Sequence, residues 1–332
     1  MEYLKKKTAA FLPALAFMTA VLMNPASAAG ADGGQLTVAA RFDLADSSSF
    51  EMHRTVTEFD GESGEQTYGI TVQFVLKVTE VTERWYDMEC RLTDFSVDEV
   101  PDRILYDAFT SVLDYAWNGM SGLSVTLRTD TEGRVTRVLN SGEVYRKARA
   151  AYDSACKESR YMNSVADAGV DVRRILRADD SYEFAKGIIE DVKALFQLYG
   201  NAFAEGETRR HSDQTKDSCE SDTSTSLLLD RNSGEYVIFV NADNYIPYFE
   251  VESQATDLAG ECFNDEVARR LRVISAEEPD RSDRNYAVYN SQLYFRFSSD
   301  GWPQEIVSEE TTRIVGAGRT ERTSVTKLSE KM

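Results

Sequence analysis

Histidine is nearly absent from this sequence: the 332 residues contain two, His53 and His211, far apart along the chain. Neither lies in an H-E-x-x-H or comparable spacing, which argues against a transition-metal enzyme. No G-x-S-x-G motif accompanies them, so we do not expect a serine hydrolase. The sequence also lacks a P-loop and a dinucleotide-binding fingerprint. We therefore expect no metal site and no cofactor, and no motif assigns a catalytic residue.

Cysteine is also scarce, and its four residues are widely spaced: Cys90, Cys156, Cys219 and Cys262. Because no C-x-x-C pair occurs, neither a zinc knuckle nor a thioredoxin-type motif is present. In an exported protein, four cysteines permit two disulfides in any of three pairings. We favour Cys219 with Cys262, since these two lie on either side of one predicted β segment. Cys90 falls on the apolar side of a predicted strand, so a buried free thiol is the alternative there.

Basic residues form no cluster beyond the start of the chain, and acidic residues outnumber them by 56 to 37, for a net charge of −19. A strongly acidic surface repels phosphate groups. We therefore expect neither nucleic acid nor an anionic membrane surface as a partner. Hydrophobic residues still make up 42% of the sequence and aromatic residues 11%, which is typical of a globular rather than a disordered protein.

Long apolar runs are missing except near the N-terminus, within residues 1–28. There, Lys5–Lys7 precede an apolar stretch, and Ala26–Ala28 match the small-x-small pattern of a signal peptidase site. The stretch is shorter than the ~20 residues that a membrane span needs, so a membrane anchor is the less favoured interpretation. No cysteine follows it, which argues against a lipid-anchored lipoprotein. We predict cleavage near Ala28, a periplasmic or secreted bacterial protein without stable membrane insertion, and a flexible leader over residues 29–35.

Residues 36–140 are predicted to form a first β unit with one helix. Apolar and polar residues alternate along three segments, residues 36–44, 68–78 and 86–92. This period of two predicts antiparallel strands with one wet face. Helical spacing predicts an amphipathic helix over residues 103–117. The sequence LSVTLRTDTEGRVTRVLN, residues 123–140, predicts a β-hairpin with a glycine turn.

Residues 141–200 change to a helical period and are predicted to form a helical connector of two or three helices. Asp180, followed three residues later by Glu183, resembles a capping box, and Gly200 is placed to end the last helix. Residues 201–332 return to β patterning, which predicts a second β unit.

The hairpin of the first unit has a counterpart in the second, LYFRFSSDGWPQEIV at residues 293–307. Aligning Leu127 with Phe297 also aligns Gly133 with Gly301, provided that the later turn is two residues shorter. Duplication explains the likeness, and chance similarity between glycine hairpins is the alternative. The predicted fold class is α+β: two curved antiparallel β-sheet units, related by duplication and linked by a helical segment.

The signal peptide, the paired hairpins and the turn sequences GRVTRVLN (residues 133–140) and DGWPQEIV (residues 300–307) form a recognisable layout. This layout resembles uncharacterised bacterial exported proteins and lipoproteins with a duplicated half-barrel β architecture, akin to the outer-membrane lipoprotein carriers. The resemblance covers most of the chain after residue 28 and implies curved sheets around a shared interior. No catalytic motif defines that group, so the resemblance implies no functional residue. This chain lacks the lipobox cysteine that many members carry.

Aromatic residues cluster in the segment NADNYIPYF, and Tyr245, Tyr248 and Phe249 are our candidate ligand-binding residues for an apolar groove. The alternative is that they belong to the core of the sheet. Residues 230–235, DRNSGE, have spacings similar to the start of a calcium loop, but the glycine stands fifth rather than sixth. A β-turn uses the same residue types and is the favoured interpretation.

These patterns favour an exported, non-catalytic envelope protein that binds an apolar ligand or a protein partner in the concavity of a curved sheet. A carboxylate-dependent hydrolase is the first alternative, because 56 acidic residues leave room for a catalytic pair that the sequence does not single out. A structural or interaction protein without a ligand is the second.

Overall fold

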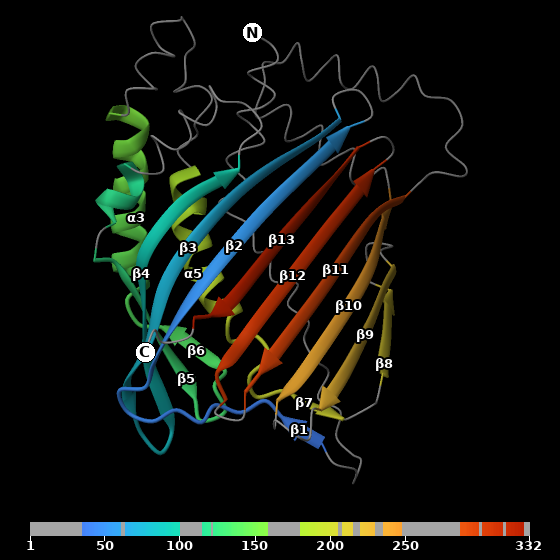
Figure 1. Cartoon of the computed structure of the whole chain (residues 1–332), viewed down its shortest axis with the longest axis horizontal. Helices are drawn as coiled ribbons and strands as arrows, with labels where there is room; N and C mark the ends of the chain where they lie inside the picture. Colours follow the sequence, from blue (N-terminus) through green and yellow to red (C-terminus); the bar gives the residue numbers. More distant parts are fainter. Residues whose placement is uncertain are drawn as a thin grey trace, which may run out of the picture.

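The structure is a computed structural model of the whole chain, and it describes most of the residues in two long β regions and the helices between them. The described residues are 35–60, 64–99, 115–120, 122–158, 180–204, 208–214, 220–229, 235–247, 286–298, 301–314 and 317–328. They form a mostly antiparallel β structure with few helices, which agrees with the predicted α+β class (Figure 1).

Among the described residues before residue 200, the labelled elements are six strands and two helices. They are β1 (Gln35–Thr37), β2 (Ser47–Asp60), β3 (Gly64–Val81), β4 (Trp85–Glu99), β5 (Ser124–Asp130), β6 (Val135–Val138), α3 (Ser141–Glu158) and α5 (Asp180–Ala194). Seven strands follow: β7 (Ala202–Ala204), β8 (Thr208–Gln214), β9 (Glu220–Leu229), β10 (Tyr236–Pro247), β11 (Tyr286–Phe297), β12 (Pro303–Ile314) and β13 (Ala317–Lys327).

Eleven of these strands form one open sheet in the order β6-β5-β4-β3-β2-β13-β12-β11-β10-β9-β8. The prediction of two separate sheets is wrong, because β2 and β13 pair along their length, from Phe50 opposite Lys327 to Asp60 opposite Ala317. Separate sheets would leave both strands with an edge of unpaired N–H and C=O groups, and the pairing satisfies those groups. The two β regions therefore lie side by side in one sheet (Figure 1).

One face of this sheet, called the inner face here, carries the buried side chains of the predicted alternation. Phe50 and Met52 on β2, and Phe74 and Leu76 on β3, are buried, whereas His53, which follows Met52, points to the outer face. Figure 1 shows α3 and α5 on one side of the sheet, beside β3 and β4, and residues of both helices belong to the same core cluster. The alternation of apolar and polar residues therefore predicts the buried face correctly in this region.

Helices α3 and α5 both fall within residues 141–200, and α5 ends before the predicted position. The α-helix ends at Ala194 rather than at Gly200. Tighter turns follow, in which the Phe196 N–H donates to the Lys193 carbonyl and the Tyr199 N–H to the Phe196 carbonyl. Gly200 then adopts a positive φ of 75°. The chain thus leaves the α-helix six residues before Gly200 and reverses at the glycine.

The segment predicted as a first strand over residues 36–44 is mostly not a strand. Only β1 is, and it pairs with β7 in a separate two-stranded sheet. Val38 and Phe42 are nevertheless buried, while Leu44 is 65% exposed. The backbone finds its hydrogen bonds elsewhere: the Val38 N–H donates to the Asn201 carbonyl and the Ala40 N–H to the Glu132 carbonyl, both at 3.0 Å.

The turns of the two hairpins have the same hydrogen-bond geometry. In the turns at residues 130–134 and 298–302, the first N–H donates to the fifth carbonyl (2.9 and 3.2 Å) and the fourth N–H to the first carbonyl (3.1 Å in both). The fourth residue is Gly133 in one and Gly301 in the other, with φ of 94° and 81°. Both turns need a left-handed residue at this position, which explains the glycines.

The strands beside these turns also match. Leu127 pairs with Val138 in one hairpin and Phe295 with Ile306 in the other, and both ladders shift register one step later. Leu127 therefore corresponds to Phe295. The alignment of Leu127 with Phe297 is wrong by two residues, because the two turns have the same length. Descent of the two β regions by duplication stays a prediction.

The sheet is strongly curved, because both turns reach the same short segment. The Ala40 N–H contacts the first turn, and a Cβ at Gly301 in the second would lie 3.1 Å from the Ala39 carbonyl oxygen and the Arg41 nitrogen. The two hairpins are six strand positions apart, which is roughly 29 Å in a flat sheet. One three-residue segment can touch both turns only if the sheet curls around it.

Candidate functional site

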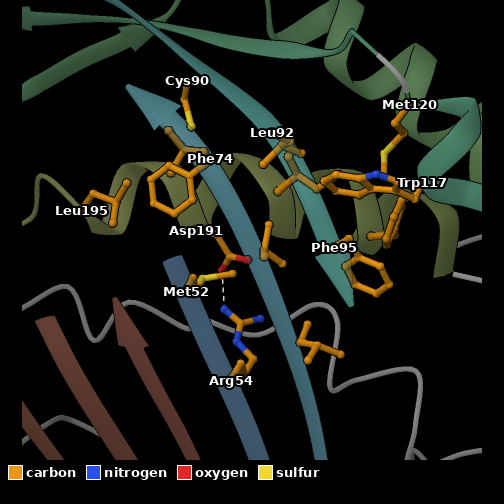
Figure 2. A pocket seen from close by; sticks show the side chains of 15 residues that line it. Met52, Arg54, Phe74, Cys90, Leu92, Phe95, Trp117, Met120, Asp191 and Leu195 are labelled. Atoms are coloured by element: carbon orange, nitrogen blue, oxygen red, sulfur yellow. Dashed lines mark hydrogen bonds and ion pairs between the residues drawn. The ribbon is translucent and has the colours of Figure 1, made fainter. Parts of the chain in front are cut away.

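An apolar pocket lies on the inner face, between the first β region and the helices that cover it. The sheet contributes Met52, Ile70, Val72, Phe74, Cys90, Leu92 and Phe95. The helical turn at residues 115–120 and α5 contribute Trp117, Met120, Phe184, Ile188, Val192 and Leu195. Two charged residues, Arg54 and Asp191, complete the lining, and Figure 2 shows the dashed line that joins them next to Met52.

A bulge in β4 explains how the pocket obtains its aromatic wall. Leu92 and Phe95 both line the pocket although they are three residues apart, an odd spacing that a regular strand would place on opposite faces. The ladder between β3 and β4 shifts register here: Phe74 pairs with Leu92, but Gln73 pairs with Asp94. The extra residue re-aims Phe95 inward, where its ring stacks on Trp117 with centroids 5.4 Å apart.

Helix α5 supplies the opposite wall through an ordinary amphipathic stripe. Phe184, Ile188, Val192 and Leu195 recur at spacings of three and four residues, so they share one helix face. Asp191 lies on the edge of the same face, next to Val192. The helix thus presents four apolar side chains and one carboxylate to the sheet.

The cavity inside this lining has a volume of about 80 Å³. An apolar cavity of about 150 Å³ in a protein core takes up benzene. The space therefore accommodates a short alkyl chain, or the end of a longer one, rather than a whole lipid molecule.

Arg54 is the unusual residue of the site, since it is a charge at an inward-facing strand position. It follows Phe50 and Met52 in the alternation of β2, and its side chain is 2% exposed. Its Nη2 donates to Asp191 Oδ1 at 2.7 Å and its Nε to Thr323 Oγ1 at 3.2 Å. Because a buried charge is stable only when it is paired, these contacts hold the guanidinium in place.

A second carboxylate stands beside the arginine on β13. Glu321 Oε1 lies 3.6 Å from Arg54 Nε. Burial works against the charge of Arg54, but the attraction of Asp191 and Glu321 outweighs it and raises the arginine pKa above its ordinary value. Burial raises the pKa of Glu321 to about 7, although Arg54 and Arg319 oppose the rise. Arg54 therefore stays charged, and Glu321 titrates near neutral pH.

Cys90 is a free thiol buried in the pocket lining, as the alternative interpretation held. Burial raises the pKa of its thiol well above the ordinary value, with a further contribution from Glu89. A thiol rather than a thiolate is present at neutral pH, and it behaves as a small apolar group instead of a nucleophile.

Of the residues predicted for ligand binding and for the disulfide, Tyr245 is the one within the described residues. Tyr245 lies in β10, opposite Val288 of β11. Tyr248, Phe249, Cys219 and Cys262 lie outside the described residues, so the groove and the disulfide stay predictions. The calcium-loop alternative at residues 230–234 also falls outside them.

The sequence did not predict the pocket, because its lining residues show the same apolar pattern as the residues of a filled core. The available signal was Arg54, a single charge that interrupts the apolar alternation of Phe50, Met52 and Val56. Its partner Asp191 lies on a helix 137 residues later, and no sequence pattern joins the two.

His53 lies on the outer face, away from the pocket, and its side chain is 45% exposed. Its Nδ1 is 3.0 Å from both Asp98 Oδ2 and Thr71 Oγ1. Among the described residues, no three His, Cys, Asp or Glu side chains stand close enough together to hold a metal ion. The described helices include none that is long and apolar enough to cross a membrane.

Comparisons with known proteins add little to this site. No family model matches the chain, and no curated protein does. A solved structure on lipid–protein interactions in lipovitellin is similar over 87% of this chain, with 10% identity and a TM-score of 0.43; the chain spans 25% of its length. A LolA superfamily protein from Nitrosomonas europaea is similar over 88% of this chain and 90% of its own, with 11% identity and a TM-score of 0.16. At these scores neither likeness assigns a function to this chain.

Proposed function

We propose that the protein is an exported, non-catalytic binding protein that holds an apolar ligand in the pocket between the sheet and α5. The observation that carries the proposal is the lining: thirteen of its fifteen side chains are apolar, and they enclose a space that no described side chain fills. Protein interiors are close-packed, and an apolar void forfeits contacts that a ligand would restore. The N-terminal pattern of residues 1–28 supports export.

The charged groups of the pocket support binding over hydrolysis. Asp191 is the one carboxylate in the lining, and it accepts a hydrogen bond from Arg54. A glycosidase-like mechanism needs two carboxyl groups across a cleft. The pocket resembles a ligand site in which many apolar contacts are combined with a single polar feature that fixes orientation.

Linear alcohols of increasing length, titrated into the full-length protein by calorimetry, test this function. Each added methylene should tighten binding about fourfold, which corresponds to ~0.8 kcal/mol. The gain should stop once the cavity is full, since later methylenes remain in water. Absence of binding for every alcohol from butanol to decanol would refute the proposal.

A pair of variants on one strand makes the test specific to the pocket. Val72 lines the cavity, and Val75 lies three residues later on the outer face of β3. Val72→Phe should fill the space and abolish alcohol binding, whereas Val75→Phe should leave it within about twofold. Circular dichroism checks that both variants fold. Equal loss of binding in the two would place the alcohol elsewhere.

A further inference from the structure

Arg54 has hydrogen-bond donors that the protein does not use. A guanidinium carries five N–H groups. Nε donates to Thr323 and Nη2 to Asp191, and no described residue accepts a hydrogen bond from Nη1. The side chain is 2% exposed, and Nη1 is not one of the fully enclosed atoms without a partner among the described residues, so the little surface that remains includes this nitrogen. An N–H group without a protein acceptor, on a side chain that is otherwise buried, is a place where an acceptor on a ligand can bind.

The unused donors belong to the pocket rather than to the opposite face of the sheet. Arg54 is itself a lining residue, and Figure 2 shows its guanidinium among the pocket side chains, directed toward Asp191. Met52 precedes it on the inward side of the same strand, and Asp191 and Val192 face it from α5. A ligand that fills the apolar cavity therefore ends near this guanidinium.

The surrounding charge decides which kind of acceptor fits. Two cations, Arg54 and Arg319, act together with three carboxylates, Asp191, Glu310 and Glu321. Counted over the described residues, the cluster has no surplus of positive charge, and Arg54 already shares its charge with Asp191 at 2.7 Å. An anionic headgroup would meet the carboxylates at close range, which is unfavourable in a buried site. An uncharged oxygen accepts the same hydrogen bond without that repulsion.

We infer that the ligand is an amphiphile whose alkyl part fills the apolar cavity and whose uncharged oxygen accepts a hydrogen bond from Arg54 Nη1. Alcohols and acyl esters or amides share this chemistry, whereas free fatty acids do not. The assignment rests on the proposed binding function of the pocket, and it adds the polar half of the ligand.

Three six-carbon ligands separate the alternatives in the unmodified protein at pH 8. Hexan-1-ol has a neutral acceptor, hexanoate an anionic one, and hexane none. Hexan-1-ol should bind about tenfold tighter than hexanoate. Equal or tighter binding of hexanoate would overturn the neutral-acceptor assignment. If none of the three binds, the proposed function itself fails, so the two failures are distinguishable. Methyl hexanoate in place of the alcohol tells an ester ligand from an alcohol.

Arg54→Lys tests whether the arginine makes the contact. Lysine keeps the charge opposite Asp191 but loses the planar fork and Nη1. Binding of hexan-1-ol should weaken about tenfold, while binding of hexane should change less than twofold. An unchanged ratio of the two affinities would overturn the inference. Arg128→Lys is the matched control. Arg128 lies on the outer face of β5, where it pairs with Asp87 of the neighbouring strand β4.

A spectroscopic readout keeps the inference testable if Arg54→Lys does not fold. Hexan-1-ol should shift the NMR signal of the Arg54 side-chain nitrogens in the unmodified protein, and hexane should shift it less. Signals of Arg128 serve as the internal reference. Identical shifts with both ligands would show that the oxygen does not reach the guanidinium.

Discussion

Two stretches of the inner face differ in what covers them. At one, called the filled end here, Phe42 enters from the chain between β1 and β2 and packs on Trp302 and Tyr86, with ring centroids 4.4 and 5.6 Å apart. Tyr199 packs edge-on against Phe297 and donates its hydroxyl hydrogen bond to the Gly301 carbonyl at 2.5 Å. Farther along, the pocket keeps a cavity although the same alternation lines it.

The difference shows that apolar alternation along the strands produces an apolar sheet face but does not determine which segment packs on that face. The protein supplies its own filling at one end, through residues 38–42 and Tyr199. At the pocket, the helices stand across a gap that the described side chains leave open. A sheet whose inner face is packed by the protein's own side chains at one end and keeps a cavity at the other could take up a ligand without losing its core, as proposed above.

The largest expected loss of stability comes from removing an aromatic side chain at the filled end. Phe42→Ala should lower the free energy of unfolding by about 4 kcal/mol, because Phe42 is 3% exposed and its ring is packed between other rings. Phe95→Ala, in the pocket wall, should cost about half as much, since Phe95 is only partly buried. Urea denaturation measures both. A larger loss for Phe95→Ala would mean that the pocket, not the filled end, carries the core.

The two equivalent turns offer a smaller and sharper comparison. Gly133 and Gly301 have the same turn geometry, but a Cβ at Gly133 would stand 2.6 Å from Tyr199 Cδ1, whereas one at Gly301 would stand 3.1 Å from backbone atoms of residues 39 and 41. Positive φ costs an alanine about 1–2 kcal/mol at either position. We expect Gly133→Ala to cost about 3 kcal/mol and Gly301→Ala about 2 kcal/mol in thermal or urea unfolding.

Gly142 near the start of α3 is the control for that pair, because nothing lies within 4 Å of the Cβ that alanine would add. Gly142→Ala should stabilise the protein by about 0.5 kcal/mol through helix propensity. Equal costs at Gly133 and Gly301 would show that the turn conformation alone, and not the contact with Tyr199, sets the penalty.

Local patterns predicted most of the elements in the first β region and the two helices. Alternation predicted a strand over residues 68–78, in which Phe74 and Leu76 are buried, and the helical period of residues 141–200 predicted helices where α3 and α5 lie. These predictions hold because side-chain direction follows from the local backbone period. The repeated glycines also predicted two alike hairpins, although not their equal turn length.

What the sequence did not reveal depends on distant partners or on irregular backbone. The pairing of β2 with β13 joins segments about 270 residues apart, such as Arg54 and Thr323, and no local period encodes it. Phe42 is buried although it lies in no strand, because neighbouring residues of its segment form backbone hydrogen bonds to distant parts of the chain. Phe95 faces the pocket through a bulge that breaks the period of two. The candidate site combines all three kinds of feature, so strand patterns alone could not outline it.

A third comparison concerns the charged residues at the edge of the pocket. Burial raises the pKa of Glu321 from 4.5 to about 7, with Arg54 on β2 and Arg319 on its own strand opposing the rise, and Glu310 on β12 and Asp191 on α5 adding to it. The folded protein keeps this proton at pH values where the unfolded chain has released it. The stabilisation from Glu321 is therefore complete below about pH 4 and is lost as the pH rises through about 7.

The free energy of unfolding contributed by Glu321 should fall by about 3 kcal/mol between pH 4.5 and pH 8. Glu321→Gln removes the titrating proton, so the difference between the unmodified protein and this variant, measured in urea across that range, isolates the effect. Glu51→Gln is the outer-face control and should leave the pH dependence in place, because Glu51 bonds to Gln73 away from the cluster. Parallel curves for the unmodified protein and Glu321→Gln would mean that water reaches Glu321. In that case the edge of the pocket is wetter than its contacts indicate, and the charge argument for a neutral ligand loses its basis.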